Sequence, residues 1–340
     1  MIKIKNIYYM LSYAFYALND DKYKKVETEE FENTADLFSE ILAIGVSKQI
    51  KQGLVKDYID VRETTSSIRG KIEITDSINS KSFLKKQLTC TYDEFSVNCY
   101  LNQILKSTML VLLKSDISSH QKKKLKNILR YFTEVDLIDV NSINWKIRFD
   151  RNNQTYRMLI GVCYLTIKGL LQSEKSGETK LMQFIDDQLM NRLYEKFILN
   201  YYKKEHPSVK ASASQINWQL DDGIDYLLPR MQSDIMLDYG DKVLIIDAKY
   251  YKNTTQSYYN TNTIHSGNLY QIFTYVKNKQ LENNNWEVSG MLLYARTDEE
   301  ILPNNSYQMS GNTISVKTLD LNQDFTLIKE QLDKIVDDYF

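Results

Sequence analysis

The stretch SDIMLDYGDKVLIIDAKYY, residues 233–251, decides the fold of this chain. Two apolar runs flank Gly240 and Asp241, a dipeptide that favours the two-residue type II′ turn of a β-hairpin. We therefore predict two antiparallel strands in which Tyr239 pairs with Lys242. Side chains alternate between the two faces of a strand, so this register fixes which residues share a face.

The predicted register brings two aspartates together. Asp234 lies opposite Asp247, and directly opposed residues have Cβ atoms about 4.5 to 5.5 Å apart. Like charges at such a position destabilise a sheet, so a cation is expected between them. Lys249 points to the same face as Asp247, whereas Ala248 points to the other. The sequence thus predicts a cluster of two acids and one lysine.

This cluster suits a divalent metal ion. Mg²⁺ prefers oxygen ligands and keeps several waters, which suits Asp234, Asp247, the carbonyl of Ala248 and a bound phosphate. Lys249 is expected to orient or help deprotonate an attacking water, while the metal lowers the pKa of that water. An exposed hairpin with ordinary surface charges is the alternative, because an aspartate followed by a distant D-x-K is a weak signal alone.

The order of elements around the hairpin narrows the fold class to α/β. Apolar residues at helical spacing predict a helix over 184–203, and a strand is expected near 214–220. A helix over 266–281 and an apolar strand over 288–295 follow the hairpin. This αβββαβ order resembles the core of the restriction-endonuclease-like, or PD-(D/E)xK, nucleases. Pro229 does not directly precede the first aspartate here, a departure that diverged members share.

The resemblance to this superfamily implies roles for two further residues. Glu195 resembles the glutamate on the upstream helix that orients the metal or its waters. Gln271 resembles the glutamine that some branches place on the second core helix to support the lysine or contact DNA. A solvated helix glutamate and a helix-surface amide are the respective alternatives.

Short motifs in a fixed order extend the resemblance beyond the core. NIYYML stands at 6–11, GKIE at 70–73, LPRM at 228–231, IDAKYYK at 246–252 and NLYQ at 268–271. In this order and over this length, the motifs resemble the McrC family, the nuclease subunits of McrBC methylation-dependent restriction systems.

The resemblance to McrC implies a partner. The family cuts double-stranded DNA bearing modified cytosine after GTP-dependent translocation by McrB, a hexameric AAA+ GTPase that recognises the modified base. This chain contains no G-x-x-x-x-G-K-[ST] motif, so GTP is expected on the partner and not here. The N-terminal half would dock into the ring and stimulate its GTP hydrolysis. Arg62, Arg69 and Lys71 are the candidate ring contacts, with an ordinary solvated hairpin as the alternative.

Composition agrees with this assignment without suggesting it. The 340 residues carry a formal net charge of −1 and are 26% charged. Holding DNA normally requires a basic surface, so a local patch or a partner must supply the attraction. The densest basic cluster lies on a predicted helix, where a solvated face is the alternative, and comprises Lys122, Lys123, Lys124 and Arg130.

We expect two domains, a partner-docking domain at 1–172 and a nuclease domain at 178–340. Within the first, a helix capped by Thr28 is predicted to run through Lys51, and β structure is predicted over 57–75. Three widely spaced cysteines argue against a disulfide framework and favour a reducing cytoplasm.

No apolar run is long enough to span a bilayer, and the run at 7–18 is expected to be a buried first helix. Two other functions remain open from the sequence. One is a regulatory or scaffolding subunit with an inactive nuclease centre, and the other is a stand-alone repair nuclease.

Overall fold

The computed structural model describes residues 3–15, 18, 23, 26, 31, 33–150, 153, 155–176, 187–250, 255–258, 261–296 and 302–340. The chain divides into two compact units, each considered by itself. The sheet unit comprises Met1–Phe31 and Ile185–Phe340, and the ladder unit comprises Glu32–Phe184.

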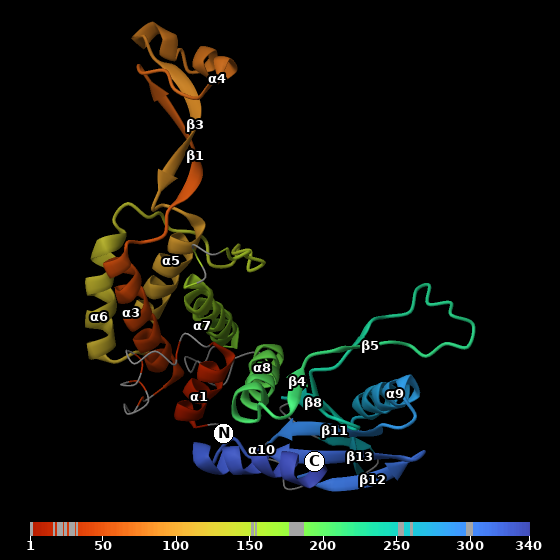
Figure 1. Ribbon diagram of the computed structural model, residues 1–340. Helices are drawn as coiled ribbons and strands as arrows, with labels where there is room; N and C mark the ends of the chain where they lie inside the picture. The colour runs from red at the N-terminus through yellow and green to blue at the C-terminus, as the bar shows by residue number, and fades with distance from the viewer. Residues whose placement is uncertain are drawn as a thin grey trace. The chain divides into compact units, whose positions relative to one another are not determined.

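This division corrects the expected domains at 1–172 and 178–340. Helix α1 (Ile4–Ala14) belongs to the sheet unit, where it packs along α8 (Asp187–Glu205) (Figure 1). The ladder unit is therefore inserted between two parts of the sheet unit. The expected boundary after residue 172 falls in helix α7, and residues 177 and 178 lie outside the described part of the chain.

Specific contacts fix α1 within the sheet unit. The side-chain amide of the buried Asn6 donates to the carbonyls of Leu321 and Gln323, both at 2.8 Å. The ring of Tyr9 stacks on Phe325 with centroids 4.2 Å apart. These contacts join residues more than 300 positions apart, so local sequence patterns do not reveal them.

The sheet unit is built on a mixed six-stranded sheet. Its longest run of pairing joins β8 in parallel to β11, and β8 is also antiparallel to β7. In spatial order the strands are β12 (Asn305–Met309), β13 (Asn312–Leu319), β11 (Glu287–Ala295), β8 (Lys242–Lys249), β7 (Ile235–Tyr239) and β4 (Lys210–Ser212). Two short ladders accompany it, β5 (Gln215–Ile216) with β6 (Met231–Gln232) and β9 (Thr255–Tyr258) with β10 (Thr261–Ile264).

The predicted hairpin and its register are confirmed. Tyr239 pairs with Lys242, and Gly240 has the φ of 69° that the first central position of a type II′ turn requires. The last paired residues are Ile235 and Ile246, so Asp234 immediately precedes β7 at the level of Asp247.

The predicted order of elements is also present, with one correction. Helix α8 is followed by β4, β7, β8, helix α9 (Ser266–Glu282) and β11. The strand expected over 214–220 is confirmed only in part: β5 lies within it but pairs with β6 outside the main sheet, and the strand that joins the main sheet is the earlier β4. Just before β5, the carbonyl of Ser214 accepts a hydrogen bond from the backbone N–H of Ser233.

Helix α9 covers the face of the sheet toward which the odd-numbered residues of β8 point. Ile272 and Val276 of α9 share a buried core with Val243 and Ile245 of β8. Alternation places Leu244 on the opposite face, where α8 packs against β8. Helix α10 (Phe325–Tyr339) joins α8 there, since the Tyr202 hydroxyl donates to the Leu332 carbonyl. Asp247 and Lys249, which are also odd-numbered, therefore emerge on the α9 face.

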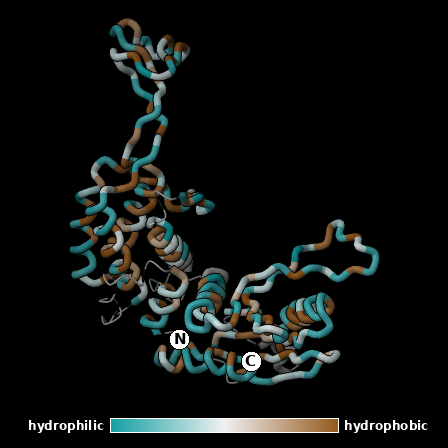
Figure 2. Tube along the Cα trace, viewed as in Figure 1, coloured by the Kyte–Doolittle hydropathy of each residue, from teal (hydrophilic) through white to brown (hydrophobic). Residues whose placement is uncertain are grey.

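The ladder unit contains a group of helices along which hydrophobic and hydrophilic residues are interspersed (Figure 2), and many of the hydrophobic ones are buried. Helix α3 begins at Thr34 and is capped by Asn33, whose side chain accepts from the Asp36 backbone at 2.9 Å. The expected cap, Thr28, lies outside the described residues. The helices are α3 (Thr34–Gln52), α5 (Tyr100–Lys114), α6 (Ser119–Leu129) and α7 (Tyr156–Ser176), with a short 3₁₀ turn η4 (Arg130–Phe132) after α6.

A long antiparallel ladder projects from these helices (Figure 1). Strand β1 (Asp57–Thr65) pairs along its length with β3 (Leu88–Ser96), a strand that the sequence pattern did not predict. Its far end, which we call the tip, carries β2 (Lys71–Ile72), α4 (Ile74–Asn79) and a 3₁₀ turn η3 (Ser82–Lys85). The β structure expected over 57–75 is thus confirmed in part.

One ion pair within the ladder unit gives a stability prediction. Lys124 of α6 lies 2.6 Å from Glu40 of α3, whose side chain is only 6% exposed. Removing one partner of a buried pair leaves an uncompensated charge, so Lys124→Ala should lower the free energy of unfolding by about 2 kcal/mol. The neighbouring exposed Lys123→Ala should change it by less than about 0.5 kcal/mol. Urea denaturation of both variants tests this, and equal effects would contradict the role of the pair.

The three cysteines, Cys90, Cys99 and Cys163, are buried and free. No described helix is both long enough and apolar enough to cross a membrane.

Candidate active site

The two strands of the hairpin bring the predicted acids and lysine into one cluster. The Lys249 ammonium lies 2.7 Å from Oδ1 of Asp247 and 3.7 Å from Oδ2 of Asp234. The same Oδ2 of Asp234 accepts the backbone N–H of Ala248 at 3.0 Å. Asp234 is thereby fixed to the strand that carries Asp247, and the lysine bridges the two carboxylates, as the register predicts.

Asp247 is the most enclosed member of the cluster. Its side chain is 3% exposed, compared with 12% for Lys249 and 20% for Asp234. Burial raises the pKa of Asp247; Lys249 opposes this rise, whereas Asp234 adds to it. Its Oδ2 atom is buried and has no hydrogen-bond partner among the described residues. A buried carboxylate oxygen without a partner is energetically costly, and a bound cation would satisfy it.

Glu195 of α8 belongs to the same electrostatic group. Partial burial and the negative charge of Asp234 raise the pKa of Glu195 to about 7, although nearby cations, first Lys249, oppose this. The side-chain amide of Asn191, one helical turn earlier, donates to Glu195. Glu195 therefore lies close enough to Asp234 and Lys249 for their charges to shift its pKa, and its role at the site remains a prediction.

Sequence reasoning missed Asn191. Its Oδ1 accepts the backbone N–H of Tyr250 at 2.7 Å, while its amide holds Glu195. One side chain thus joins α8 to the end of β8 and orients the acid. The available signal was a polar residue four positions before Glu195, which places both on one face of the helix.

Gln271 is not joined to the cluster as expected. Its side-chain amide donates at 2.9 Å to the hydroxyl of Tyr275 in the same helix. Between the described residues Gln271 and Lys249 no hydrogen bond is present. Asn268, also on α9, is linked to the strand position beside the lysine. Its side-chain amide donates to the hydroxyl of Tyr294, and Tyr294 of β11 pairs with Lys249 of β8.

The residues of the cluster fit a magnesium ion that retains water and substrate ligands. Within the part of the chain that the structure describes, no three His, Cys, Asp or Glu side chains gather as a complete set of ligands. Asp234 and Asp247 offer carboxylate oxygens, one of them the unpartnered Oδ2 atom. Mg²⁺ characteristically takes one or two carboxylates and completes its shell with water and phosphate.

The candidate ring contacts are engaged within the ladder. Arg62 pairs with Asp76, and Lys71 lies 3.1 Å from Glu73. Arg69 lies 2.6 Å from Glu63 and places its guanidinium 3.8 Å from the centre of the Tyr92 ring. These cations therefore stabilise the ladder itself, whatever else they contact.

Of the four residues in the basic cluster, Lys124 forms an ion pair with Glu40. A role of this cluster in DNA binding stays a prediction. Lys123 and Arg130 are exposed and Lys122 is half-buried, so these three remain candidates.

The fold and the site define a class: a mixed α/β protein that holds two carboxylates and a lysine on adjoining strands, with a helix glutamate beside them. The model of the family described as McrBC 5-methylcytosine restriction system component matches residues 3–295. This match spans most of the 340 residues, and the chain belongs to that family. The family membership predicted from the motifs is confirmed.

One curated protein and one solved structure are similar to this chain. The chain is 28% identical over 345 residues to the type IV methyl-directed restriction enzyme EcoKMcrBC of Escherichia coli K12, and the match covers all of this chain and 98% of that protein. A solved half-complex from a tetradecameric assembly of Thermococcus gammatolerans McrB AAA+ hexamers with bound McrC is also similar. Its TM-score is 0.49 and its identity 16%, over 96% of this chain and 75% of that chain.

Proposed function

We propose that this chain is the endonuclease subunit of a McrBC-type restriction system, with a PD-(D/E)xK core in the sheet unit. The observation that carries the proposal is the cluster of Asp234, Asp247 and Lys249, with an unpartnered buried oxygen on Asp247. The reaction is hydrolysis of a DNA phosphodiester bond.

Each residue of the cluster has a role in this reaction. Asp234 and Asp247, with the Ala248 carbonyl, would hold Mg²⁺, which lowers the pKa of a water and stabilises charge on the phosphate. Lys249 orients the attacking water and places a positive charge beside the phosphate. Glu195 and Asn191 position the cluster from α8, and the burial of Asp247 strengthens its attraction for a cation. A supporting role for Gln271 remains a prediction.

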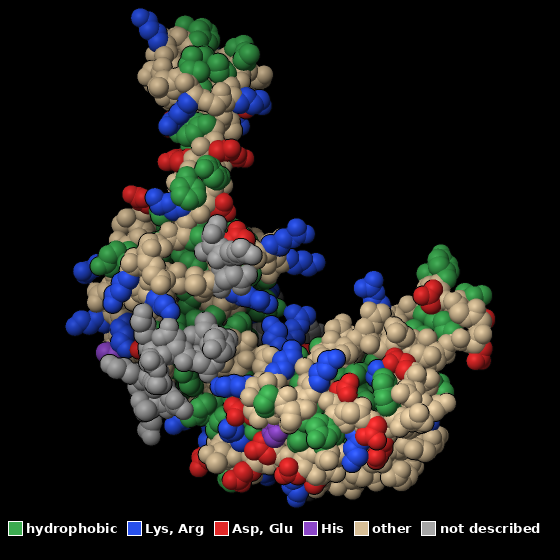
Figure 3. All heavy atoms as spheres, viewed as in Figure 1, with side chains coloured by type: hydrophobic (Ala, Val, Ile, Leu, Met, Phe, Trp, Pro, Cys, Tyr) green, Lys and Arg blue, Asp and Glu red, His purple; other side chains and the backbone are tan. Residues whose placement is uncertain are grey.

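The proposed partner is a hexameric AAA+ GTPase of the McrB type, which binds GTP and recognises modified cytosine in double-stranded DNA. The tip of the ladder is the proposed docking surface, because hydrophobic side chains gather there with lysines around them (Figure 3). The large exposed hydrophobic residues of the tip are Ile68, Ile72, Ile74, Ile78, Phe83 and Leu84. Three free cysteines are consistent with action in a reducing cytoplasm.

The test is cleavage of cytosine-methylated plasmid by the purified chain with Mg²⁺, with and without the AAA+ partner and GTP. Cleavage only in the complete mixture supports the proposal. Stimulation of GTP hydrolysis without any cleavage would favour a regulatory subunit with an inactive centre. Cleavage that needs no GTPase would favour a stand-alone nuclease.

Magnesium should also stabilise the sheet unit without any substrate. A ligand that binds only the folded state at about one hundred times its dissociation constant adds about 2.7 kcal/mol. We therefore expect Mg²⁺ to raise the unfolding temperature of the wild type by several degrees and to leave that of Asp247→Asn unchanged. Differential scanning calorimetry with Mg²⁺ or chelator measures this, and an equal rise in both proteins would place the ion elsewhere.

A further inference from the structure

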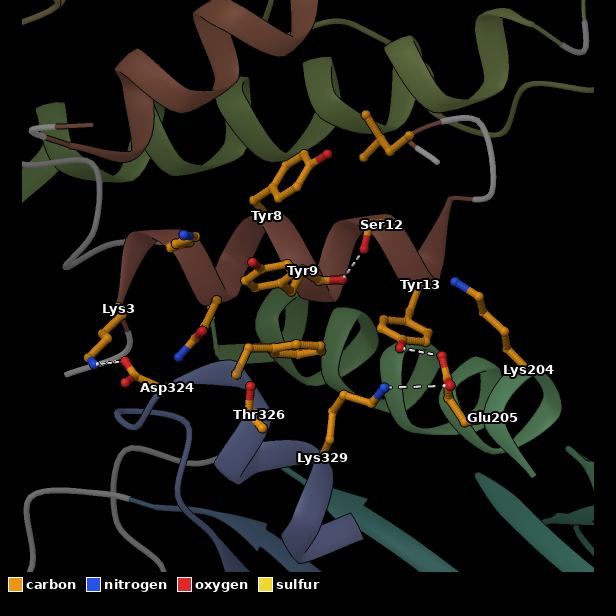
Figure 4. A pocket seen from close by; sticks show the side chains of 14 residues that line it. Lys3, Tyr8, Tyr9, Ser12, Tyr13, Lys204, Glu205, Asp324, Thr326 and Lys329 are labelled. Carbon is orange, nitrogen blue, oxygen red and sulfur yellow. Dashed lines mark hydrogen bonds and ion pairs between the residues drawn. The ribbon is translucent and has the colours of Figure 1, made fainter. Parts of the chain in front are cut away.

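The sheet unit contains a cavity that the proposed nuclease reaction does not use. It lies between α1, the end of α8 and the start of α10 and has a volume of about 780 Å³ (Figure 4). This volume lies within the range of sites that bind small molecules, about 300 to 1,000 Å³. The residues of the acid cluster do not line the cavity.

Aromatic rings line the middle part of the cavity. Tyr9 and Phe325 stack with an interplanar angle of 16°, and the Tyr13 ring lies 6.0 Å from Phe325. Figure 4 shows Tyr9 between Lys3 at one end and Lys204 and Lys329 at the other. The lining therefore offers flat apolar surfaces between cationic ends.

Lysines outnumber acids around the cavity. At one end Lys3 lies 2.7 Å from Asp324, and this pair, together with the charge of Lys5, holds the pKa of Asp324 below its usual range. Lys5 also lines the cavity and, among the described residues, forms no ion pair with a carboxylate.

At the other end Lys329 lies 3.5 Å from Glu205. Partial burial raises the pKa of Glu205, but the Tyr13 hydroxyl and the charges of Lys329 and Lys204 together lower it by more. The net pKa is below the usual range, so the carboxyl stays ionised. Lys204 lies 5.0 Å from the centre of the Tyr13 ring and, like Lys5, pairs with no described carboxylate. Each end thus holds two lysines and one acid, so the lining carries an excess of positive charge at both ends.

We propose that this cavity binds a short segment of unpaired nucleic acid, with phosphates at the lysines and bases against the aromatic rings. Aromatic platforms within a cationic groove are the usual means of holding single strands without sequence preference. A duplex offers phosphates but not the faces of its bases, so it satisfies only half of this lining. The same chemistry also fits a free nucleotide, and the experiment separates these two sources.

The position of the cavity connects it to the acid cluster. Helix α8 carries Glu195 in the cluster and Lys204 in the cavity, and nine residues of α-helix span about 14 Å. Nine residues are also about two and a half turns, so the two side chains lie on opposite sides of α8, and a strand released at the cluster would pass around this helix to reach the cavity. The inference rests on the proposed function only in expecting DNA at the sheet unit.

Binding is measured with full-length Asp247→Asn, so that cleavage cannot interfere. The anisotropy of a fluorescent oligothymidylate is followed in Mg²⁺-free buffer of low ionic strength. Adding Lys5→Glu and Lys204→Glu should weaken binding at least about tenfold and reduce the slope of log affinity against log salt by about 1.4, as expected for two lost phosphate contacts.

The matched control reverses the charge of two other lysines of the sheet unit. Lys203 of α8 and Lys334 of α10 are exposed and do not line the cavity. Lys203→Glu with Lys334→Glu should leave the affinity within about twofold of the parent, because only general electrostatics change. An equal loss in both double variants, or no binding at all, overturns the proposal.

Competition identifies the source of the ligand. Unlabelled single strands should displace the probe, whereas duplex of the same length should do so at least about tenfold less well. Displacement by GMP, GTP or inorganic phosphate at the affinity of the single strand would overturn the strand assignment in favour of a free nucleotide or phosphate. Unfolding temperatures of all variants check that the comparison is between folded proteins. Strand binding is measured without cleavage, so a failure of plasmid cleavage would contradict the proposed function and not this inference.

Discussion

Asp247→Asn is expected to reduce cleavage of methylated DNA at least about a thousandfold, equivalent to about 4 kcal/mol of activation free energy. The substitution preserves the shape of the side chain but removes the charge from the most enclosed position of the cluster. Without that charge the unpartnered oxygen no longer attracts a cation. The measurement is the initial rate of plasmid cleavage in the complete mixture with Mg²⁺, GTP and the AAA+ partner.

The same variant should stimulate GTP hydrolysis by the partner within about twofold of the wild type. This separation follows because Asp247 lies in the sheet unit, whereas the proposed docking surface is the tip of the ladder unit. Glu282→Gln on α9, which removes a carboxylate remote from the cluster in an ion pair with Lys279, serves as the charge control. Loss of cleavage and of GTPase stimulation together would count against separate roles for the two units.

Gly70→Ala is expected to reduce GTPase stimulation at least about tenfold while leaving the magnesium-dependent stabilisation intact. Gly70 has a φ of 66°, a conformation that costs an alanine about 1 kcal/mol. A Cβ atom there would also overlap the carbonyl oxygen of Thr91 and lie 2.6 Å from Cβ of Tyr92. Both obstacles are backbone or Cβ atoms of β3, so the tip cannot keep β2 against β3.

Gly53→Ala provides the matched control in the same unit. Gly53 also has a positive φ, 89°, but an added Cβ would meet no atom within 4 Å. This variant carries the conformational cost without the steric one and should retain at least about half of the stimulation. If Gly70→Ala stimulates the GTPase normally, the arrangement of the tip does not determine the contact with the ring.

The hairpin was predictable because its determinants are local. The turn residues fix the register, and the register alone places Asp234 at the level of Asp247. Alternation then assigns Lys249 to the same face. Helical spacing located α8 and α9 to within a few residues, so Glu195 and its relation to the acids followed once the order of elements was known.

The features that escaped prediction depend on contacts between distant residues. Strand β3 mixes polar and apolar residues, because both of its faces are partly exposed along the ladder, and only its pairing with β1 defines it. Helix α1 has no sequence signal that assigns it to a sheet formed by residues nearly two hundred positions later. Asn191 and the Lys124 to Glu40 pair act through partners on other elements.

The insertion of the ladder unit into the sheet unit has a consequence for synthesis on the ribosome. Helix α1 emerges early, but its contact partners on α8 and around the start of α10, which Asn6, Tyr9 and Tyr13 reach, emerge only after the whole ladder unit has been translated. The ladder unit can complete its fold before the elements that pack against α1 have been synthesised. The acid cluster therefore assembles last, so the nascent chain acquires the proposed docking unit before it acquires the proposed nuclease centre.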